Sequence, residues 1–266
     1  MMIAFQNKLI YLGYIPYGSR HETYERDRSF PLEVREQIVW TEDRKKLHGF
    51  VVNQPGVKQG PVMVYFQGNA GNMIHRLGLF KTMVDAIPDL TVVGICYRGF
   101  GSSLGRASEK GLQKDAKAIL SFVHQQYPAR PIYVYGHSLG GSVAVDICQH
   151  VQVQGLILEN TYTSIQDMVQ AIYPRHTPYP LIAKAFLWNH WKSQDKIPKV
   201  QAPILFLSAD KDEIVPSAQM HKLYAAASSS SYRKFVNFPK AMHMDTFTKE
   251  PVAFKKALRD FISETS

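Results

Sequence analysis

The segment GHSLG at residues 136–140 holds a serine with glycines two positions before it and two positions after it. It follows an apolar run that reads as a strand and opens a stretch that reads as a helix. In a sharp strand-to-helix turn the serine backbone is strained, and glycines at those two positions remove side chains that would clash. Such a turn raises the hydroxyl to the carboxyl edge of the sheet, where α/β proteins bind ligands. Ser138 is therefore the predicted nucleophile.

A serine hydroxyl is a weak nucleophile, so it needs a general base, and the base needs an acid that orients it. In this architecture the chain order is serine, acid, histidine. The apolar run ILFLSA ends in DKDEIVP and the run KFVNFP ends in KAMHMDTF, so both tails fall at the same edge of the sheet. His243 is the predicted base. Asp212 is the favoured acid and Asp210 the alternative, whereas Asp245 is expected to cap the last helix.

The tetrahedral intermediate of acyl transfer needs backbone N–H donors for its oxyanion. One predicted donor is the N–H of Leu139, directly after the nucleophile. The other is the N–H of Asn69 in the loop FQGNAGN, whose glycines allow a tight turn. His137, beside the nucleophile, is expected to form a pocket wall or to pack. We expect Tyr162 and Met242, together with His137, to contact the substrate.

Short apolar runs alternate with amphipathic segments along most of the chain. Most runs are continuously apolar, as strands buried on both faces are. This alternation predicts the α/β class, with a mostly parallel, twisted sheet flanked by helices on both faces. The runs at 36–40 and 47–53 lack an intervening helix, which predicts an antiparallel hairpin at one edge. The remaining predicted strands lie at 61–68, 90–97, 131–137, 154–160, 203–209 and 233–239.

The length of 266 residues suits one domain, 1–266. The segment 161–201 separates two predicted strands and is longer than one crossover helix requires. It predicts a small helical cap insertion over the carboxyl edge of the sheet, and a crossover helix followed by a loop is the alternative. Its aromatic side chains indicate either an apolar pocket wall or core packing: Tyr179, Phe186, Trp188 and Trp191.

The chain carries 31 Lys and Arg residues against 22 Asp and Glu residues, a formal net charge of +9. The charges are scattered and no nucleic-acid-binding motif accompanies them, so we expect a solvated basic surface and no nucleic-acid partner. Cys96 and Cys148 lie in apolar runs, which predicts buried thiols without a disulfide. No apolar stretch reaches the roughly 18–20 residues needed to span a bilayer. We expect an intracellular protein, cytoplasmic or membrane-associated, that requires no metal and no cofactor.

Seven segments, in order along nearly the whole chain, match one known family. They are FQNKLIY (5–11), GNAGN (68–72), YRGFGSSLGRASEKGL (97–112), GHSLGG (136–141), LENTYTSI (158–165), DEIVP (212–216) and HMDT (243–246). On these residues the chain resembles the α/β-hydrolase superfamily and, within it, the eukaryotic bem-type serine hydrolases of the abhydrolase-domain-13 type. The resemblance implies the α/β-hydrolase fold and a Ser–Asp–His triad, which falls on Ser138, Asp212 and His243. Members of the family commonly carry an amino-terminal membrane anchor, and this chain is expected to begin where such an anchor ends.

Three positions beside the site depart from the family pattern. Gln67 stands where the family usually has His, His137 where it often has Arg, and Met244 where it usually has Asn. None of these departures removes a catalytic group. Because they flank the site, they concern which substrates it prefers.

The expected function is a serine hydrolase that cleaves carboxylic esters, or thioesters or amides, through an acyl-enzyme on Ser138. The expected substrate is a small-molecule or lipid-like ester, the expected state is a monomer, and the basic surface is compatible with peripheral membrane association. One alternative is a protein depalmitoylase, acyl-thioesterase or acyltransferase acting at a membrane surface. A non-catalytic binding module that keeps the fold is another. Haloalkane and epoxide chemistry are disfavoured, because the elbow residue is Ser rather than Asp.

Overall fold

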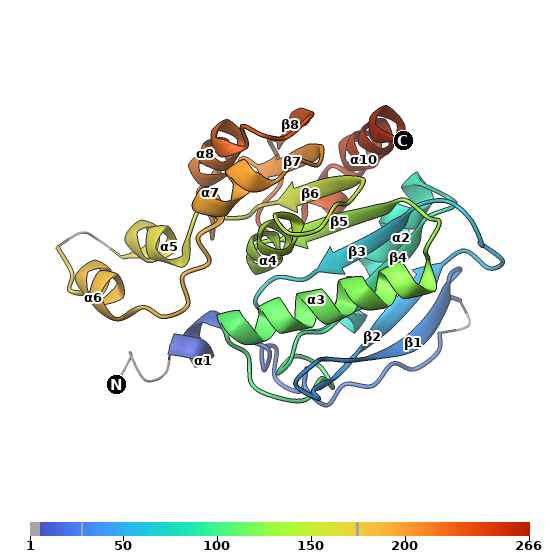
Figure 1. Ribbon diagram of the computed structural model, residues 1–266, viewed down its shortest axis with the longest axis horizontal. Coiled ribbons are helices and arrows are strands. Elements are labelled where there is room, and N and C mark those ends of the chain that lie inside the picture. The colour runs from blue at the N-terminus through green and yellow to red at the C-terminus, as the bar shows by residue number, and fades with distance from the viewer. Residues whose placement is uncertain (1–5, 28, 174–175) are drawn as a thin grey trace.

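The computed structural model describes residues 6–27, 29–173 and 176–266, so Phe5 of the first family segment lies outside the described residues. The described chain forms an eight-stranded sheet (Figure 1). Its strands are β1 (Glu33–Trp40), β2 (Lys46–Asn53), β3 (Val62–Phe66), β4 (Thr91–Ile95), β5 (Ile132–His137), β6 (Gly155–Glu159), β7 (Ile204–Ala209) and β8 (Arg233–Phe238). Their order across the sheet is β1-β2-β4-β3-β5-β6-β7-β8.

The pairing confirms the predicted fold class and the predicted hairpin. Strand β1 pairs with β2 in antiparallel register from Glu33 opposite Asn53 to Trp40 opposite Lys46. Strand β2 is also antiparallel to β4, and every later pairing is parallel. Every residue of β3, β4, β5, β6 and β7 is buried, which explains why these runs read as continuously apolar.

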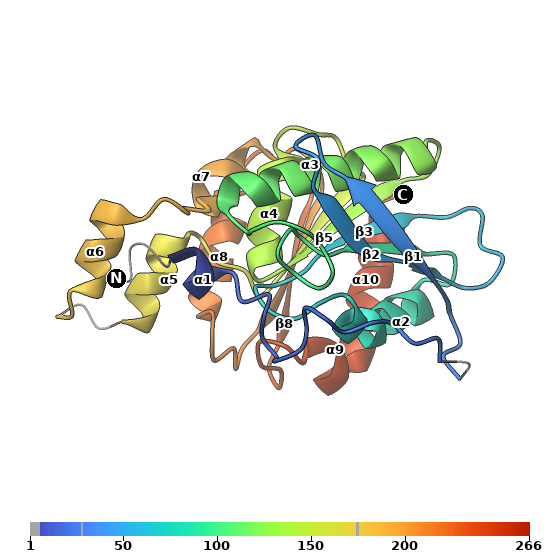
Figure 2. The same cartoon turned by 90° about the horizontal axis from the view of Figure 1, so that it is seen from below.

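Helices cover both faces of this sheet (Figure 2). Helices α3 (Glu109–Gln126) and α4 (Leu139–Cys148) pack together on one face, and α2 (Leu77–Ala86) and α10 (Pro251–Thr265) pack together on the other. Helix α3 begins after Ser108, whose hydroxyl accepts a hydrogen bond from the Gly111 N–H at 3.2 Å and so caps the helix. Helices thus cover both faces of the sheet, and the carboxyl ends of its strands are left to carry the functional site.

The long connection between β6 and β7 is helical. It contains α5 (Ile165–Ile172), α6 (Tyr179–Phe186), α7 (Ser193–Lys196) and the 3-10 turn η3 (Ile197–Lys199). Helices α5 and α6 stand away from the sheet, and the short helix α1 (Gln6–Ile10) lies near them (Figures 1 and 2). The described part of the segment 161–201 is thus largely helical, and its residues 174 and 175 lie outside the described residues.

The chain ends in two helices where one was predicted. Helix α8 (Ser217–Ala226) precedes β8, and after it come α9 (Thr246–Lys249) and then α10. Pro251 begins α10, and the residue before a proline is disfavoured in helical conformation, so the helix breaks at Glu250.

Cys96 and Cys148 are buried and free, as predicted. Burial raises the pKa of the Cys96 thiol to about 12, so this group stays protonated near neutral pH.

Within the described residues, none of the helices combines the length and the apolar character that crossing a membrane requires.

Candidate active site

Ser138 occupies the turn between β5 and α4 with φ 53° and ψ −120°, the strained conformation that the glycine spacing predicts. A Cβ on Gly140 would lie 1.9 Å from the carbonyl oxygen of Phe66, and one on Gly136 would lie 2.4 Å from the carbonyl oxygen of Gly140. Neither glycine can carry a side chain without moving backbone. The turn therefore packs against β3, on the side of the sheet that leads to the loop with Asn69.

Asp212 and His243 meet at the ends of the two last strands. The Nδ1 atom of His243 lies 2.7 Å from Oδ2 of Asp212, and the two side chains are 4% and 2% exposed. The other carboxylate oxygen of Asp212 accepts the N–H groups of Ile214 and Val215 at 2.8 and 2.7 Å. Asp210 is exposed, and its side chain makes no hydrogen bond or ion pair within the described residues. Of the two acids considered from the sequence, Asp212 is the one that reaches the imidazole.

The backbone carbonyl of His243 is held from two sides. Nε2 of His137 lies 2.9 Å from that oxygen, and the Nδ2 amide of Asn160 donates to it at 3.0 Å. Burial, followed by the nearby His243, lowers the pKa of His137 well below its usual value, so its ring is neutral. Nε2 of His137 therefore carries the donated proton, and its buried Nδ1 has no partner among the described residues. The two imidazole rings lie 4.9 Å apart, which places His243 beside the residue that precedes Ser138.

Acidic side chains close the turn that carries His243. Oε2 of Glu213 accepts the N–H of His243 at 3.0 Å, and Oδ1 of Asp245 accepts the N–H of Met242 at 2.7 Å. The prediction that Asp245 caps a helix is wrong for its side chain, which makes no capping bond to α9. The carboxylate turns back toward Met242 instead, because the tight turn offers a free N–H there.

The two residues whose backbone N–H groups are expected to bind an oxyanion line the same cavity as Ser138. A Cβ on Gly68 would lie 3.5 Å from Cβ of Ser138, so the loop with Asn69 contacts the elbow. Leu139 is the first residue of α4, and the N–H groups of a first helical turn lack intrahelical acceptors. Within the described residues, neither the Asn69 N–H nor the Leu139 N–H donates to another protein group.

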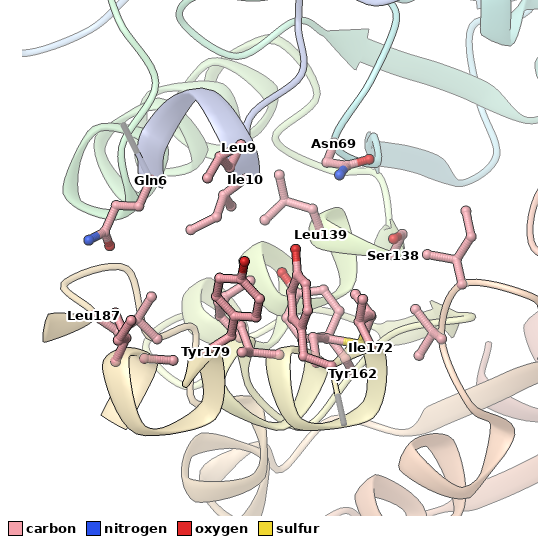
Figure 3. A pocket seen from close by; sticks show the side chains of 18 of the residues that line it. Gln6, Leu9, Ile10, Asn69, Ser138, Leu139, Tyr162, Ile172, Tyr179 and Leu187 are labelled. Carbon is pink, nitrogen blue, oxygen red and sulfur yellow. The ribbon is translucent and has the colours of Figure 1, made fainter. Parts of the chain in front are cut away.

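A cavity of about 280 Å³ opens beside these groups (Figure 3). Asn69, Ser138 and Leu139 form one end of it, α1 forms one side, and α5 and α6 form the opposite side. None of the described lining side chains is charged, and most of them are hydrocarbon or aromatic. The cavity therefore suits an uncharged, extended apolar group.

The three residues expected to contact substrate have different positions. Tyr162 lines the cavity and is buried. His137 is buried behind the elbow and does not line the cavity. Met242 is 42% exposed and also lies outside the lining.

The aromatic residues of the helical insertion divide between the two roles considered from the sequence. Tyr179 and Phe186 line the cavity. Trp191 is 1% exposed and donates its Nε1–H to the hydroxyl of Tyr11 at 3.0 Å, which is a packing role. Trp188 is half-exposed and lies outside the lining.

Sequence reasoning missed the contribution of α1. Gln6, Leu9 and Ile10 line the cavity although they lie more than 120 residues before Ser138. The family segment FQNKLIY contains all three, so a resemblance pointed to these positions without indicating a role.

The described residues contain no group of three or more His, Cys, Asp or Glu side chains that could hold a metal ion.

Several known proteins are similar to this chain. A family model described as "Serine aminopeptidase, S33" matches residues 78–192. The chain is 36% identical to protein Bem46 of Schizosaccharomyces pombe over 99% of this chain and 87% of that one. It is 28% identical to the lysophosphatidylserine lipase ABHD12 of Xenopus tropicalis over 77% of this chain and 58% of that one. A Pyrococcus furiosus esterase shares the fold with a TM-score of 0.74 at 16% identity, over 92% of this chain and 98% of the esterase. The sheet order, the serine elbow and the extent of the match to Bem46 together show that this chain belongs to the α/β-hydrolase family, among the abhydrolase-domain proteins related to Bem46.

Proposed function

We propose that the chain is a serine hydrolase that cleaves carboxylic esters through an acyl-enzyme formed on Ser138. The observation that carries this proposal is the buried 2.7 Å contact between Asp212 and His243, in a turn fastened to the residue that precedes Ser138. The family supports a hydrolase, and its solved relative is an esterase.

The first half of the reaction forms the acyl-enzyme. Oγ of Ser138 attacks the carbonyl carbon of the ester while Nε2 of His243 takes the hydroxyl proton. The N–H groups of Asn69 and Leu139 donate to the oxyanion of the tetrahedral intermediate. The carbon–oxygen bond to the leaving group then breaks, and Nε2 gives its proton to the departing alcohol. Asp212 holds the proton on Nδ1, so that Nε2 keeps the lone pair that the first step needs.

The second half returns the free enzyme. Water attacks the acyl carbonyl, His243 takes a proton from the water, and the same two N–H groups hold the new oxyanion. The bond to Oγ breaks, Ser138 recovers its proton from His243, and the carboxylic acid leaves. No redox step or cofactor enters this sequence of bonds.

The cavity favours an ester with an aliphatic acyl group. Its uncharged lining between α1, α5 and α6 can bury a hydrocarbon chain, and each buried methylene contributes about 0.8 kcal/mol. In this proposal the segment 161–201 is the cap that supplies one wall. The name of ABHD12, a lysophosphatidylserine lipase, is consistent with a lipid-like substrate here.

The same cavity supports a second candidate, an acyl-thioesterase or acyltransferase that acts on a fatty acyl group at a membrane surface. Large apolar side chains are exposed on the helices beside the cavity: Leu9 is 55%, Leu181 is 72% and Phe186 is 55% exposed. Such side chains could contact an acylated peptide or a lipid surface. Turnover of an S-acyl-cysteine peptide, compared with an aryl ester of the same chain length, separates this candidate from the first.

The proposed function is tested with p-nitrophenyl esters of increasing chain length and with a fluorophosphonate probe. We expect hydrolysis and covalent labelling in the wild type, and loss of both in Ser138→Ala, with a fall in kcat of about 10⁶-fold if the triad acts as a unit. Ser208→Ala is the matched control, because the Ser208 hydroxyl is buried without a hydrogen-bond partner among the described residues. Equal labelling of Ser138→Ala and wild type would refute the mechanism.

A further inference from the structure

The amino-terminal segment 6–15 runs from the cap to the loop that carries Asn69. Helix α1 faces α5 and α6 across the cavity, and Asn69 lies at the end of that cavity near Ser138 (Figure 3). The chain after α1 then continues beside the loop, where Leu12 forms a parallel bridge with Ala70. One segment therefore touches both the acyl cavity and the oxyanion loop.

Two backbone hydrogen bonds fix the loop to this segment. The N–H of Leu12 donates to the carbonyl oxygen of Asn69 at 2.7 Å, and the N–H of Gly71 donates to the carbonyl oxygen of Ile15 at 2.7 Å. The first bond holds the peptide that follows Asn69, so it limits the rotation of the Asn69 backbone. The direction of the Asn69 N–H therefore depends on where Leu12 stands.

Tyr11 fixes the position of Leu12. Its side chain is 4% exposed, and its hydroxyl donates to Oδ1 of Asn189 at 2.8 Å while accepting from Nε1 of Trp191 at 3.0 Å. Burial raises the pKa of Tyr11, so the hydroxyl keeps its proton and remains a donor. Both partners belong to the connection after α6.

Asn189 links the same hydroxyl to α1. Its Nδ2 amide donates to Oδ1 of Asn7 at 2.6 Å and to Oε1 of Gln6 at 3.2 Å. The amide oxygen of Gln6 also accepts the N–H of Trp188 at 3.0 Å. The cap thus holds α1 and Tyr11 together, immediately before the residue that holds Asn69.

We propose that Tyr11 is a positioning residue for the oxyanion hole: by fastening the segment 6–15 to the cap, it sets the Leu12–Asn69 bond and through it the direction of the Asn69 N–H. This inference rests on the proposed function, since it assigns a role within the same reaction. Tyr11 lies outside the cavity lining, so its side chain does not itself contact a group bound there.

The test compares Tyr11→Phe with Tyr133→Phe. Each variant removes one buried tyrosine hydroxyl, and that of Tyr133 bonds to Thr265 at 3.0 Å, near the carboxyl end of α10 and away from the cavity. For Tyr11→Phe we expect kcat to fall about tenfold or more, below the roughly 10²–10³-fold loss when a whole oxyanion donor is removed. KM should stay constant, and the fall should be the same for acetate, hexanoate and decanoate esters. Tyr133→Phe should retain wild-type kcat.

Inhibition by a transition-state analogue shows whether Tyr11 positions the oxyanion hole or only packs in the core. An alkyl boronic acid forms a tetrahedral adduct with a reactive serine, so its inhibition constant should rise in Tyr11→Phe by the same factor by which kcat falls. An unchanged kcat and inhibition constant in folded Tyr11→Phe would overturn the proposal. Absence of serine labelling in the wild type would instead overturn the proposed function itself.

A second variant covers the case in which Tyr11→Phe does not fold. Asn189→Leu removes the Oδ1 oxygen that accepts from the Tyr11 hydroxyl and keeps a side chain of similar size. We expect kcat to fall as in Tyr11→Phe. Wild-type kcat in folded Asn189→Leu would also contradict the proposal.

Discussion

Nε2 of His137 lies 2.9 Å from the carbonyl oxygen of His243, so the residue before the elbow serine fastens the turn that carries the predicted base. Burial makes a charged imidazole costly at this position, so the ring that donates to this carbonyl is neutral. His137 therefore affects both the free energy of unfolding and the position of His243.

His137 should make stability depend on pH. Because its folded pKa lies below the ordinary value of 6.5, the unfolded state binds one more proton below pH 6.5. The contribution of the neutral ring is fully present above that pH and is lost as the pH falls. His137→Gln keeps an amide donor toward the His243 carbonyl and cannot titrate.

The measurement is urea unfolding of wild type and His137→Gln at several pH values. Between pH 5 and pH 6.5 the wild-type free energy of unfolding should rise with pH more steeply than that of the variant, by up to about 1.4 kcal/mol per pH unit. Above pH 7.5 the two curves should run parallel. Parallel curves over the whole range would show that His137 is not held neutral by the fold.

Asp212→Asn should abolish most of the ester hydrolysis and leave the fold almost unchanged. The amide nitrogen that replaces an oxygen beside Nδ1 of His243 favours the wrong imidazole tautomer, which lowers kcat by about 10⁴-fold. Asp210→Asn is the matched control, two residues away and exposed, and it should keep wild-type kcat. Ester hydrolysis and circular dichroism of both variants make the comparison, and equal activity of the pair would contradict the role given to Asp212.

Two glycine replacements should differ in sign. A Cβ on Gly141 would lie 2.4 Å from both Cβ and Oγ1 of Thr161, whose hydroxyl donates to the carbonyl of Ser138. Gly141→Ala should therefore lower the free energy of unfolding by about 1–3 kcal/mol and reduce activity. Gly78, in the first turn of α2, has open space around its Cβ position, so Gly78→Ala should raise stability by up to about 1 kcal/mol. Denaturant unfolding checks both, and equal effects would mean that the packing at Thr161 is loose.

Arg98 should be essential for stability because it pairs with a fully buried acid. Its backbone N–H and its Nε each lie 2.8 Å from Asp115, whose side chain is 0% exposed, and its guanidinium also donates to Asp43 at 2.7 and 2.9 Å. Arg98→Met leaves Asp115 buried without its counter-charge and should cost about 3–5 kcal/mol.

The control for Arg98 is Lys256→Met in the exposed i,i+4 pair with Asp260, where a loss of about 0.5 kcal/mol or less is expected. Thermal and denaturant unfolding compare the two variants. A loss at Arg98 no larger than at Lys256 would mean that Asp115 finds another partner or is protonated without cost.

Much of the architecture could be inferred from local patterns. The apolar runs that became β3, β5 and β7 are each long enough to be buried on both faces, and that property resides in consecutive residues. The serine elbow is also local, because Gly136 and Gly140 are required by contacts within a few residues and with the adjacent β3. Given the chain order of serine, acid and histidine in this architecture, the acid and the base could be sought in the tails of the last two strands.

Other features depended on residues that meet only after folding. The sequence favoured Asp212 and kept Asp210 as the alternative, and the side of the turn that faces His243 decides between them. Asn160 reaches the carbonyl of His243 across 83 positions, and Tyr11 reaches Asn189 across 178. Neither contact has a periodic signal in the chain.

The division therefore follows the range of the interactions. Hydrophobic period and turn chemistry act over a few neighbouring residues, so this chain's amino-acid order fixes its strands, its elbow and the edge of the sheet where its polar groups gather. Three features exist only where distant segments pack together. They are the cavity wall formed by α1, the hydrogen bonds to the backbone carbonyl of His243, and the contacts that link Tyr11, through Leu12, to the loop with Asn69. These features depend on the directions of side chains and on contacts between segments that are far apart in the sequence. The spacing of residues along the chain encodes neither the directions nor the contacts.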